Sequence, residues 1–140
     1  MDSPVLVVLD TNVLIAAGFN PKSNSARLVQ AVRTGQIRMV WNEAIRREYR
    51  ATIDRIPMLD WFAFQDMMTP DSRDDSADLS DAGLEPIVDP EDRKFAALAR
   101  ATGAILVTSD DHLLSVRDQL NLIIRTPAEL IKSLGLAPPL

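Results

Sequence analysis

The chain has 140 residues, of which 46% are hydrophobic and 25% charged, and its net charge at pH 7 is −5. The acidic balance argues against a general nucleic-acid binder, unless local basic groups and bound cations assist binding. With no cysteine and no long apolar run, we expect no disulfide, no zinc–thiolate site, no signal peptide and no membrane partner. We expect a soluble, cytoplasmic protein with a single domain over residues 1–135 and a tail over residues 136–140.

The first predicted element is a strand over residues 5–9, Val-Leu-Val-Val-Leu, which ends at Asp10 and is followed by Thr11 and Asn12. A short, continuously apolar run is typical of a strand buried on both faces, as in a parallel sheet between helices. Such sheets bind ligands at the carboxyl ends of their strands. Asp10 is therefore the first candidate functional residue.

Helices and a strand are predicted next along the chain. The patterns indicate a short helix after Asn12, a helix over residues 25–34 capped by Ser25, a strand over residues 37–41, and a helix over residues 43–54 capped by Asn42.

The helix over residues 43–54 has two faces when its residues are spaced by ~100°. Glu48 falls on the apolar stripe with Ile45 and Tyr49, whereas Glu43 falls on the opposite face. An inward-facing acid is a functional candidate, although Glu48 can also reach solvent or pair with an arginine one turn away. The opposite face carries three arginines that either bind RNA phosphate or are merely solvated: Arg46, Arg47 and Arg50.

Less regular structure is expected in the middle of the chain. Residues 59–68 suggest a short helix rich in large apolar side chains, and residues 84–88 suggest a short extended segment. Between them, residues 69–83 are rich in Asp, Ser and Pro without apolar periodicity. Because their spacing is not that of a calcium-binding loop, a solvated acidic loop is the favoured interpretation.

Asp89 and Pro90 then form a strong helix start, with the aspartate as N-cap and the proline in the first turn. The helix is expected to end at Gly103. Asp92 points towards its apolar face and is the third candidate acid, but Asp89 and Glu91 are close neighbours and remain alternatives for the same role.

Residues 104–108 repeat the opening pattern, an apolar strand followed by Ser109 and Asp110. We expect Asp111 to cap a short helix around His112, which leaves Asp110 free. A lone histidine at a helix start is more often a surface residue than a catalytic one.

The last elements are a strand over residues 121–125 and a helix from Thr126, whose capping box with Glu129 is followed by an end at Gly135. The alternation of strands and helices predicts an α/β fold, a three-layer α/β/α sandwich with a central parallel sheet.

Four carboxylates can converge at one edge of this sheet. Without a cation they would repel one another and raise some of their pKa values. Mg²⁺ or Mn²⁺, as one or two ions, prefers such oxygen ligands, and can activate water for displacement at a phosphodiester. The four candidates are Asp10, Glu48, Asp92 and Asp110.

With these four acids in place, the sequence resembles the PIN domain, a metal-dependent ribonuclease fold, and in particular its toxin-like VapC-type branch in bacteria and archaea. Four segments carry the resemblance in order, and with their spacing they cover about residues 5–132. They are Val-Val-Leu-Asp-Thr-Asn-Val-Leu, Trp-Asn-Glu-Ala-Ile-Arg-Arg-Glu-Tyr, Asp-Pro-Glu-Asp-Arg-Lys-Phe-Ala-Ala-Leu-Ala and Ile-Leu-Val-Thr-Ser-Asp-Asp-His-Leu-Leu.

The resemblance implies that the same four acids are the metal ligands and catalytic groups, with Asp110 acting directly or through water. It implies that Thr11 and Asn12 shape the first site and that Ser109, where the family often has glycine, lies beside the last. It also implies an RNA substrate, a homodimer, and often a small antitoxin partner. The acidic loop over residues 69–83 departs from the family pattern.

Other readings compete with the nuclease. A haloacid-dehalogenase phosphotransferase needs an acid where Asn12 stands, and a receiver domain needs paired acids after the first strand, where Leu9 precedes Asp10. A catalytically silent PIN-like module that binds RNA or protein is the serious rival, but a degenerate copy would more readily have lost one of the four acids. The favoured function is an endoribonuclease that leaves a 5′-phosphate and a 3′-hydroxyl, the toxin of a toxin–antitoxin pair.

Overall fold

A parallel four-stranded sheet lies at the centre of the protein, in the strand order β2-β1-β3-β4. The computed structural model describes residues 4–75 and 79–136. Val7 of β1 lies opposite Met39 of β2 on one side and Ile105 of β3 on the other. The strands are β1 (Val5–Leu9), β2 (Ile37–Met39), β3 (Ile105–Val107) and β4 (Ile124–Arg125).

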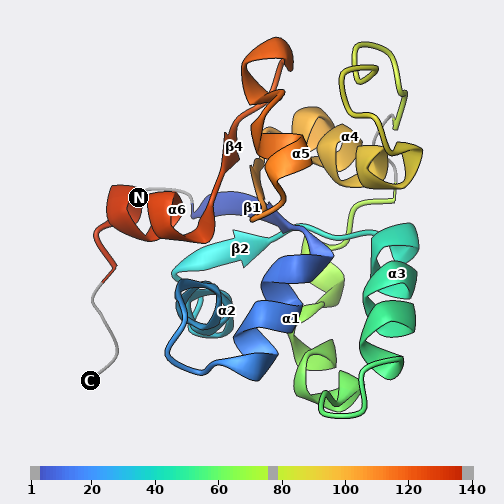
Figure 1. The fold of residues 1–140 in the computed structure, drawn as a ribbon. Helices are drawn as coiled ribbons and strands as arrows, with labels where there is room; N and C mark the ends of the chain where they lie inside the picture. Colours follow the sequence, from blue (N-terminus) through green and yellow to red (C-terminus); the bar gives the residue numbers. More distant parts are fainter. Residues whose placement is uncertain (1–3, 76–78, 137–140) are drawn as a thin grey trace.

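Helices cover both faces of this sheet. Figure 1 shows α1, α2 and α3 on one side and α4 and α5 on the other, so the predicted three-layer α/β/α sandwich is confirmed. The helices are α1 (Thr11–Phe19), α2 (Asn24–Arg33), α3 (Glu43–Asp54), α4 (Arg93–Thr102), α5 (Asp111–Leu114) and α6 (Pro127–Leu134). None of the helices in residues 4–75 and 79–136 is long and apolar enough to cross a membrane.

The apolar runs of the strands supply the centre of the core. Val7, Val8 and Leu9 of β1 are completely buried, as expected for a strand covered on both faces. Tyr49 of α3 and Phe95 of α4 are also completely buried, and their rings lie 6.2 Å apart between centroids. This contact joins α3, which carries Glu48, to α4, which begins directly after Asp92.

Several predicted boundaries differ from the observed ones. Ser23, not Ser25, caps α2, because its hydroxyl accepts a hydrogen bond from the backbone amide of Ala26. Residues 59–68 form two short 3₁₀ turns rather than one helix, at Trp61–Ala63 and Gln65–Met67. The last strand is shorter than residues 121–125, and begins at Ile124.

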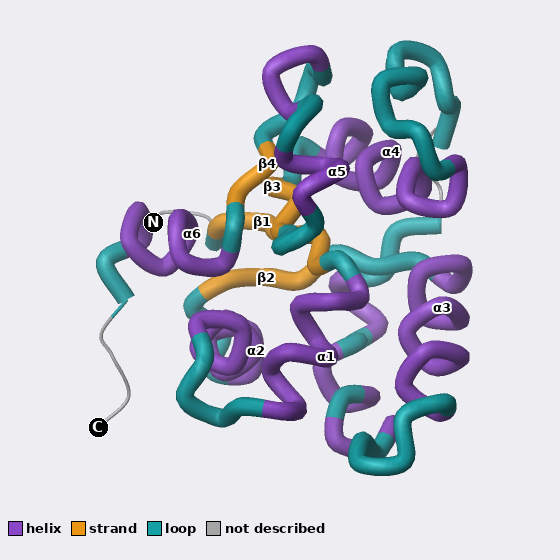
Figure 2. Tube along the Cα trace, in the orientation of Figure 1, coloured by secondary structure: helices purple, strands orange, loops and turns teal. Residues whose placement is uncertain are grey.

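The segment 84–88 is not extended, which corrects the prediction for it. The amide of Leu84 donates to the carbonyl of Asp81, and the amide of Ile87 donates to the carbonyl of Leu84. Local bonds of this kind make consecutive turns, and the three-residue spacing buries both Leu84 and Ile87. In Figure 2 this stretch is drawn as loop.

Residues 69–83, hereafter the acidic insertion, connect the two sides of the fold. Their first part bonds to the segment that leads into α3, through a parallel bridge between Trp41 and Arg73. Their last part bonds to α4, where the guanidinium of Arg100 donates to the carbonyls of Ser80 and Ala82. Residues 76–78 of the insertion, and residues 137–140 of the predicted tail, lie outside the described part of the chain.

Candidate metal-binding active site

Asp10 lies at the carboxyl end of β1, where its backbone amide donates to the carbonyl of Val107 at 2.9 Å. Its side chain is held from several directions: Oδ1 accepts from the amide of Thr11 at 2.7 Å, and Oδ2 accepts from the hydroxyl of Thr108 at 2.7 Å and the amide group of Asn12 at 3.2 Å. Only 6% of the residue is exposed. Asp10 is thus a buried, fixed carboxylate at the edge where α/β sheets bind ligands.

Thr108 is a site residue that the sequence analysis missed. It is completely buried at the end of β3, and its hydroxyl also accepts a hydrogen bond from the amide of Asp110 at 3.0 Å. One hydroxyl therefore fixes the carboxylate of Asp10 and the backbone of Asp110. The available signal was a hydroxyl residue at the end of an apolar strand, two residues before an acid.

Glu48 points inward from α3, as its place on the apolar stripe predicted. Its Oε2 accepts from the hydroxyl of Thr11 at 2.6 Å, so Thr11 links Glu48 to the backbone next to Asp10. The neighbouring Tyr49 anchors the helix to the sheet, since its buried hydroxyl donates to the carbonyl of Leu9. The other oxygen of Glu48 lies 2.5 Å from the ammonium of Lys94, a partner that was not predicted.

Asp92 is half-buried in the turn that leads into α4, where burial raises the pKa of its carboxyl to about 6. The charges of Asp10, Asp110 and Glu48 also raise this pKa, as does that of Asp89, so Asp92 shares an electrostatic environment with the other three candidates.

The two alternatives for the third acid have other partners. Asp89 is exposed and caps the turn by accepting from the amide of Glu91. The side chain of Glu91 is 79% exposed and forms an ion pair with Lys94 at 3.2 Å. Asp92 therefore stays the predicted third acid.

Asp110 does not have the arrangement expected for it. It is Asp110, not Asp111, that caps α5, because its Oδ1 accepts from the amide of His112 at 2.9 Å. β3 ends at Val107, and two residues separate its end from the cap at Asp110. Ser109 is exposed and its amide lies 3.4 Å from Oδ1 of Asn12, while His112 is an exposed residue of the short helix.

The cluster carries excess negative charge. Burial raises the pKa of Asp10 and the hydrogen bonds from Thr108 and Thr11 lower it, while the charges of Glu48 and Asp110 raise it. Within residues 4–75 and 79–136, no three acidic or histidine side chains stand close enough to share one metal ion. The donors nevertheless fit Mg²⁺ or Mn²⁺ chemically, because all are carboxylate or hydroxyl oxygens. Burial, and after it the charges of neighbouring acids, raise the pKa of Asp10 and of Asp92, and a bound cation would offset those charges.

The predicted basic face of α3 is paired within its own helix. Arg46 and Arg47 lie 2.5 Å and 3.4 Å from Glu43, and Arg50 lies 3.5 Å from Asp54. Each of these arginines thus already has a carboxylate partner on α3, which weakens its case as a phosphate-binding group.

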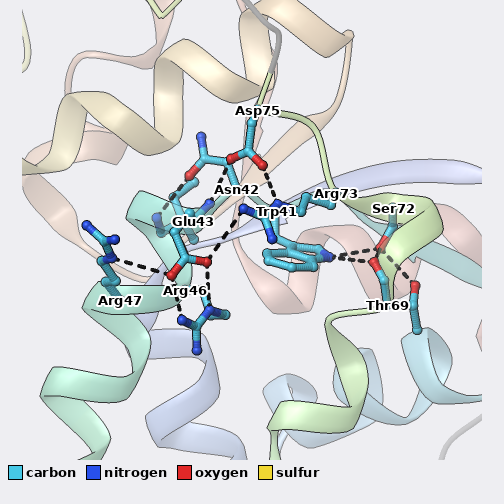
Figure 3. A network of polar contacts seen from close by, with 10 residues as sticks. Trp41, Asn42, Glu43, Arg46, Arg47, Thr69, Ser72, Arg73 and Asp75 are labelled. Carbon is cyan, nitrogen blue, oxygen red and sulfur yellow. Dashed lines mark hydrogen bonds and ion pairs between the residues drawn. The ribbon is translucent and has the colours of Figure 1, made fainter.

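Glu43 is less exposed than its place on the outer face of the helix predicted, because the acidic insertion covers it. Figure 3 shows Glu43 between Arg46, Arg47 and Arg73, with Asp75 beside it. The amide of Glu43 donates to Asp75 at 3.0 Å, and the guanidinium of Arg73 lies 5.2 Å from the centre of the Trp41 ring. The hydrogen bond from Arg46, above all, lowers the pKa of Glu43 to about 2.

The comparisons with known proteins agree with this fold. A family model described as PIN domain matches residues 6–112. A search of curated proteins found no match. The solved structure of PAE2754 from Pyrobaculum aerophilum is similar with a TM-score of 0.59 and 19% identity, over 95% of this chain and 91% of that one.

A second similar structure is that of VapBC2 from Rickettsia felis bound to a DNA fragment from their promoter. The TM-score is 0.55 at 14% identity, and the alignment covers 87% of this chain and 98% of that one. At such identities the two structures support the fold, and the family model covers most of the sequence, including all four candidate acids. The chain belongs to the PIN domain family.

Proposed function

We propose that this protein is a divalent-metal-dependent endoribonuclease, with Asp10, Glu48, Asp92 and Asp110 as its catalytic and metal-binding acids. The observation that carries the proposal is the raised pKa of Asp10 and Asp92 in a cluster made of oxygen donors at the carboxyl edge of a parallel sheet. PIN domains are generally metal-using nucleases, which agrees with this chemistry.

The side chains that surround the acids have positioning roles in this proposal. Thr108 and Asn12 aim Oδ2 of Asp10, and Thr11 holds the inner oxygen of Glu48. Asp110 is fixed by its helix cap with one oxygen engaged. The chemistry that Mg²⁺ or Mn²⁺ supplies in such a site is activation of water and stabilisation of the charge on the phosphate, which leads to a 5′-phosphate and a 3′-hydroxyl.

The biological role that we propose is that of the toxin in a VapC-type toxin–antitoxin pair, acting as a homodimer in the cytoplasm. Its support is the fold shared with a protein described as VapBC2 in complex with promoter DNA. A small antitoxin protein would then be the partner. The test is to look for a small open reading frame next to the gene, to express its product together with this protein, and to ask whether the two copurify.

The test of the enzymatic function is cleavage of mixed structured and single-stranded RNA with Mn²⁺, with Mg²⁺ and with a chelator. We expect metal-dependent cleavage, and a loss of at least about 100-fold in Asp10→Asn, because even the outer partners of metal ligands affect activity by about 10–100-fold. If the folded protein cleaves no RNA with any metal and no inhibitor copurifies, a catalytically silent PIN-like binding module becomes the better description.

A further inference from the structure

Lys94 brings a positive charge into the acid cluster. It is the second residue of α4, two residues after Asp92, and its side chain is only 21% exposed. Its ammonium lies 2.5 Å from Oε1 of Glu48 and 3.2 Å from Oε2 of Glu91. Lys94 thus connects α4 to α3 across the candidate site.

The position is unfavourable for a lysine by local criteria. A cation in the first turn of a helix opposes the helix dipole, which favours acids there. Partial burial adds a further penalty for the charged ammonium. The local i,i+3 ion pair with Glu91 and the contact with Glu48 offset these effects. Of the two, only the contact with Glu48 depends on how α3 and α4 pack.

The contact uses the oxygen of Glu48 that the rest of the site leaves available. Thr11 holds Oε2, and Lys94 holds Oε1. Among the described residues, no ion pair joins Asp10, Asp92 or Asp110 to a basic side chain, so Glu48 differs from the other candidates in having its charge neutralised.

We propose that Lys94 is a built-in competitor of the divalent cation, whose ammonium holds Glu48 in the metal-free protein and leaves it when the metal binds. The inference rests on the proposed function, since it assigns Glu48 to the metal. Lys94 is then a positioning residue: it keeps Glu48 ordered and neutralised in the absence of metal, and it weakens the affinity of the site for the ion.

The experiment is a calorimetric titration of metal-free protein with Mn²⁺, without RNA. Lys94→Met removes the ammonium but keeps a long apolar side chain, and Lys132→Met on the exposed face of α6 makes the same change in net charge away from the site. We expect Lys94→Met to bind Mn²⁺ about tenfold more tightly than Lys132→Met, the size of effect that a partly buried ion pair allows. Lys94→Arg keeps the charge and should bind like the wild type.

A double-mutant cycle separates displacement from a general effect of the nearby charge. In the Glu48→Gln background Lys94 keeps only its ion pair with the exposed Glu91 and no longer holds a candidate metal ligand, so Lys94→Met should no longer tighten Mn²⁺ binding. If it tightens binding equally there, Lys94 acts through its field alone and the proposed displacement is wrong. Equal affinities of Lys94→Met and Lys132→Met would also overturn it.

Melting temperatures provide a readout that does not depend on activity. Without metal, Lys94→Met should have a lower melting temperature than the wild type. Addition of Mn²⁺ should raise its melting temperature more than that of the wild type, because the metal replaces the missing cation. If Lys94→Met does not fold without metal, Lys94→Gln takes its place in the titration. Absence of Mn²⁺ binding in all variants and in the wild type would instead refute the metal-dependent function, and the role of Lys94 with it.

Discussion

Helix α3 carries two glutamates, five residues apart, that end in opposite electrostatic surroundings. Glu48 faces a cluster in which Asp10 and Asp92 have raised pKa values. Glu43 faces a network with Arg46, Arg47 and Arg73, in which its own pKa falls to about 2. Their side chains are similarly exposed, at 26% and 27%, so burial does not distinguish them.

The difference lies in the balance of charge. In the Glu43 network each carboxylate is paired with an arginine, so no additional cation is required to balance its charge. Further along the helix, Glu48 pairs with Lys94, and no basic partner of Asp10, Asp92 or Asp110 is found in residues 4–75 and 79–136. An acid group that remains in excess after its hydrogen bonds and ion pairs are counted is better explained by a cation that binds it than by stability.

The largest expected effect is a loss of RNA cleavage that separates the two glutamates. Glu48→Gln should reduce metal-dependent RNA cleavage by at least about 100-fold, whereas Glu43→Gln, the same change on the same helix, should stay within about twofold. Initial rates on one labelled RNA at saturating Mn²⁺ measure both. Equal losses in the two variants would mean that α3 acts as a scaffold and not through Glu48.

A smaller loss of metal affinity or activity is expected at Thr108, which hydrogen-bonds to Asp10. Thr108→Val keeps the shape of the side chain but removes the hydrogen bond to Asp10 and the acceptor for the amide of Asp110. We expect a loss of about 10–100-fold in Mn²⁺ affinity or activity, the usual range for groups that orient metal ligands. Thr108→Ser retains the hydroxyl and should recover most of the loss; if it is as defective as valine, packing and not the hydrogen bond is responsible.

Much of the fold could be predicted because its signals are local. The apolar runs of β1 and β3 and the capping box at Thr126 each depend on a few neighbouring residues, and the structure confirms them. Residues 84–88 were misjudged for the same reason. An apolar stretch beside a proline fits a strand as well as two turns, and only the pocket that receives Leu84 and Ile87 decides between them.

The site was less predictable wherever its contacts join distant parts of the chain. The four acids were identifiable from strand ends, a helical stripe and the family resemblance. Lys94 meets Glu48 only after α3 and α4 have packed, and the cover of Glu43 by Arg73 depends on how the acidic insertion folds back. Neither contact has a periodicity or spacing that a sequence would reveal.

A third test uses pH and compares Asp92→Asn with the wild type in the metal-free state. Because the folded pKa of Asp92 is raised to about 6, its contribution to stability is present below the unfolded pKa of about 3.9 and is lost as pH rises through 6. The free energy of unfolding of the variant, relative to that of the wild type, should rise by about 1 kcal/mol between pH 4 and pH 7. This is less than the full pKa shift of Asp92 implies, because solvent screens the carboxylate. Urea midpoints measure this, and saturating Mn²⁺ should abolish the gain; a constant difference across this range would refute the raised pKa.

The smallest effect should have the opposite sign, at Glu43. Since its folded pKa is lowered to about 2, its contribution to stability is present above the unfolded pKa of about 4.3 and is lost as pH falls towards 2. Glu43→Gln should therefore be less stable than the wild type at pH 7, with a difference that shrinks at pH 3, as urea midpoints at the two values would show. Exposed ion pairs contribute little, so the change should be smaller than that of Asp92→Asn and weaker still in high salt. If the two variants instead shift in the same direction with pH, the charge balance that separates the two ends of α3 does not exist.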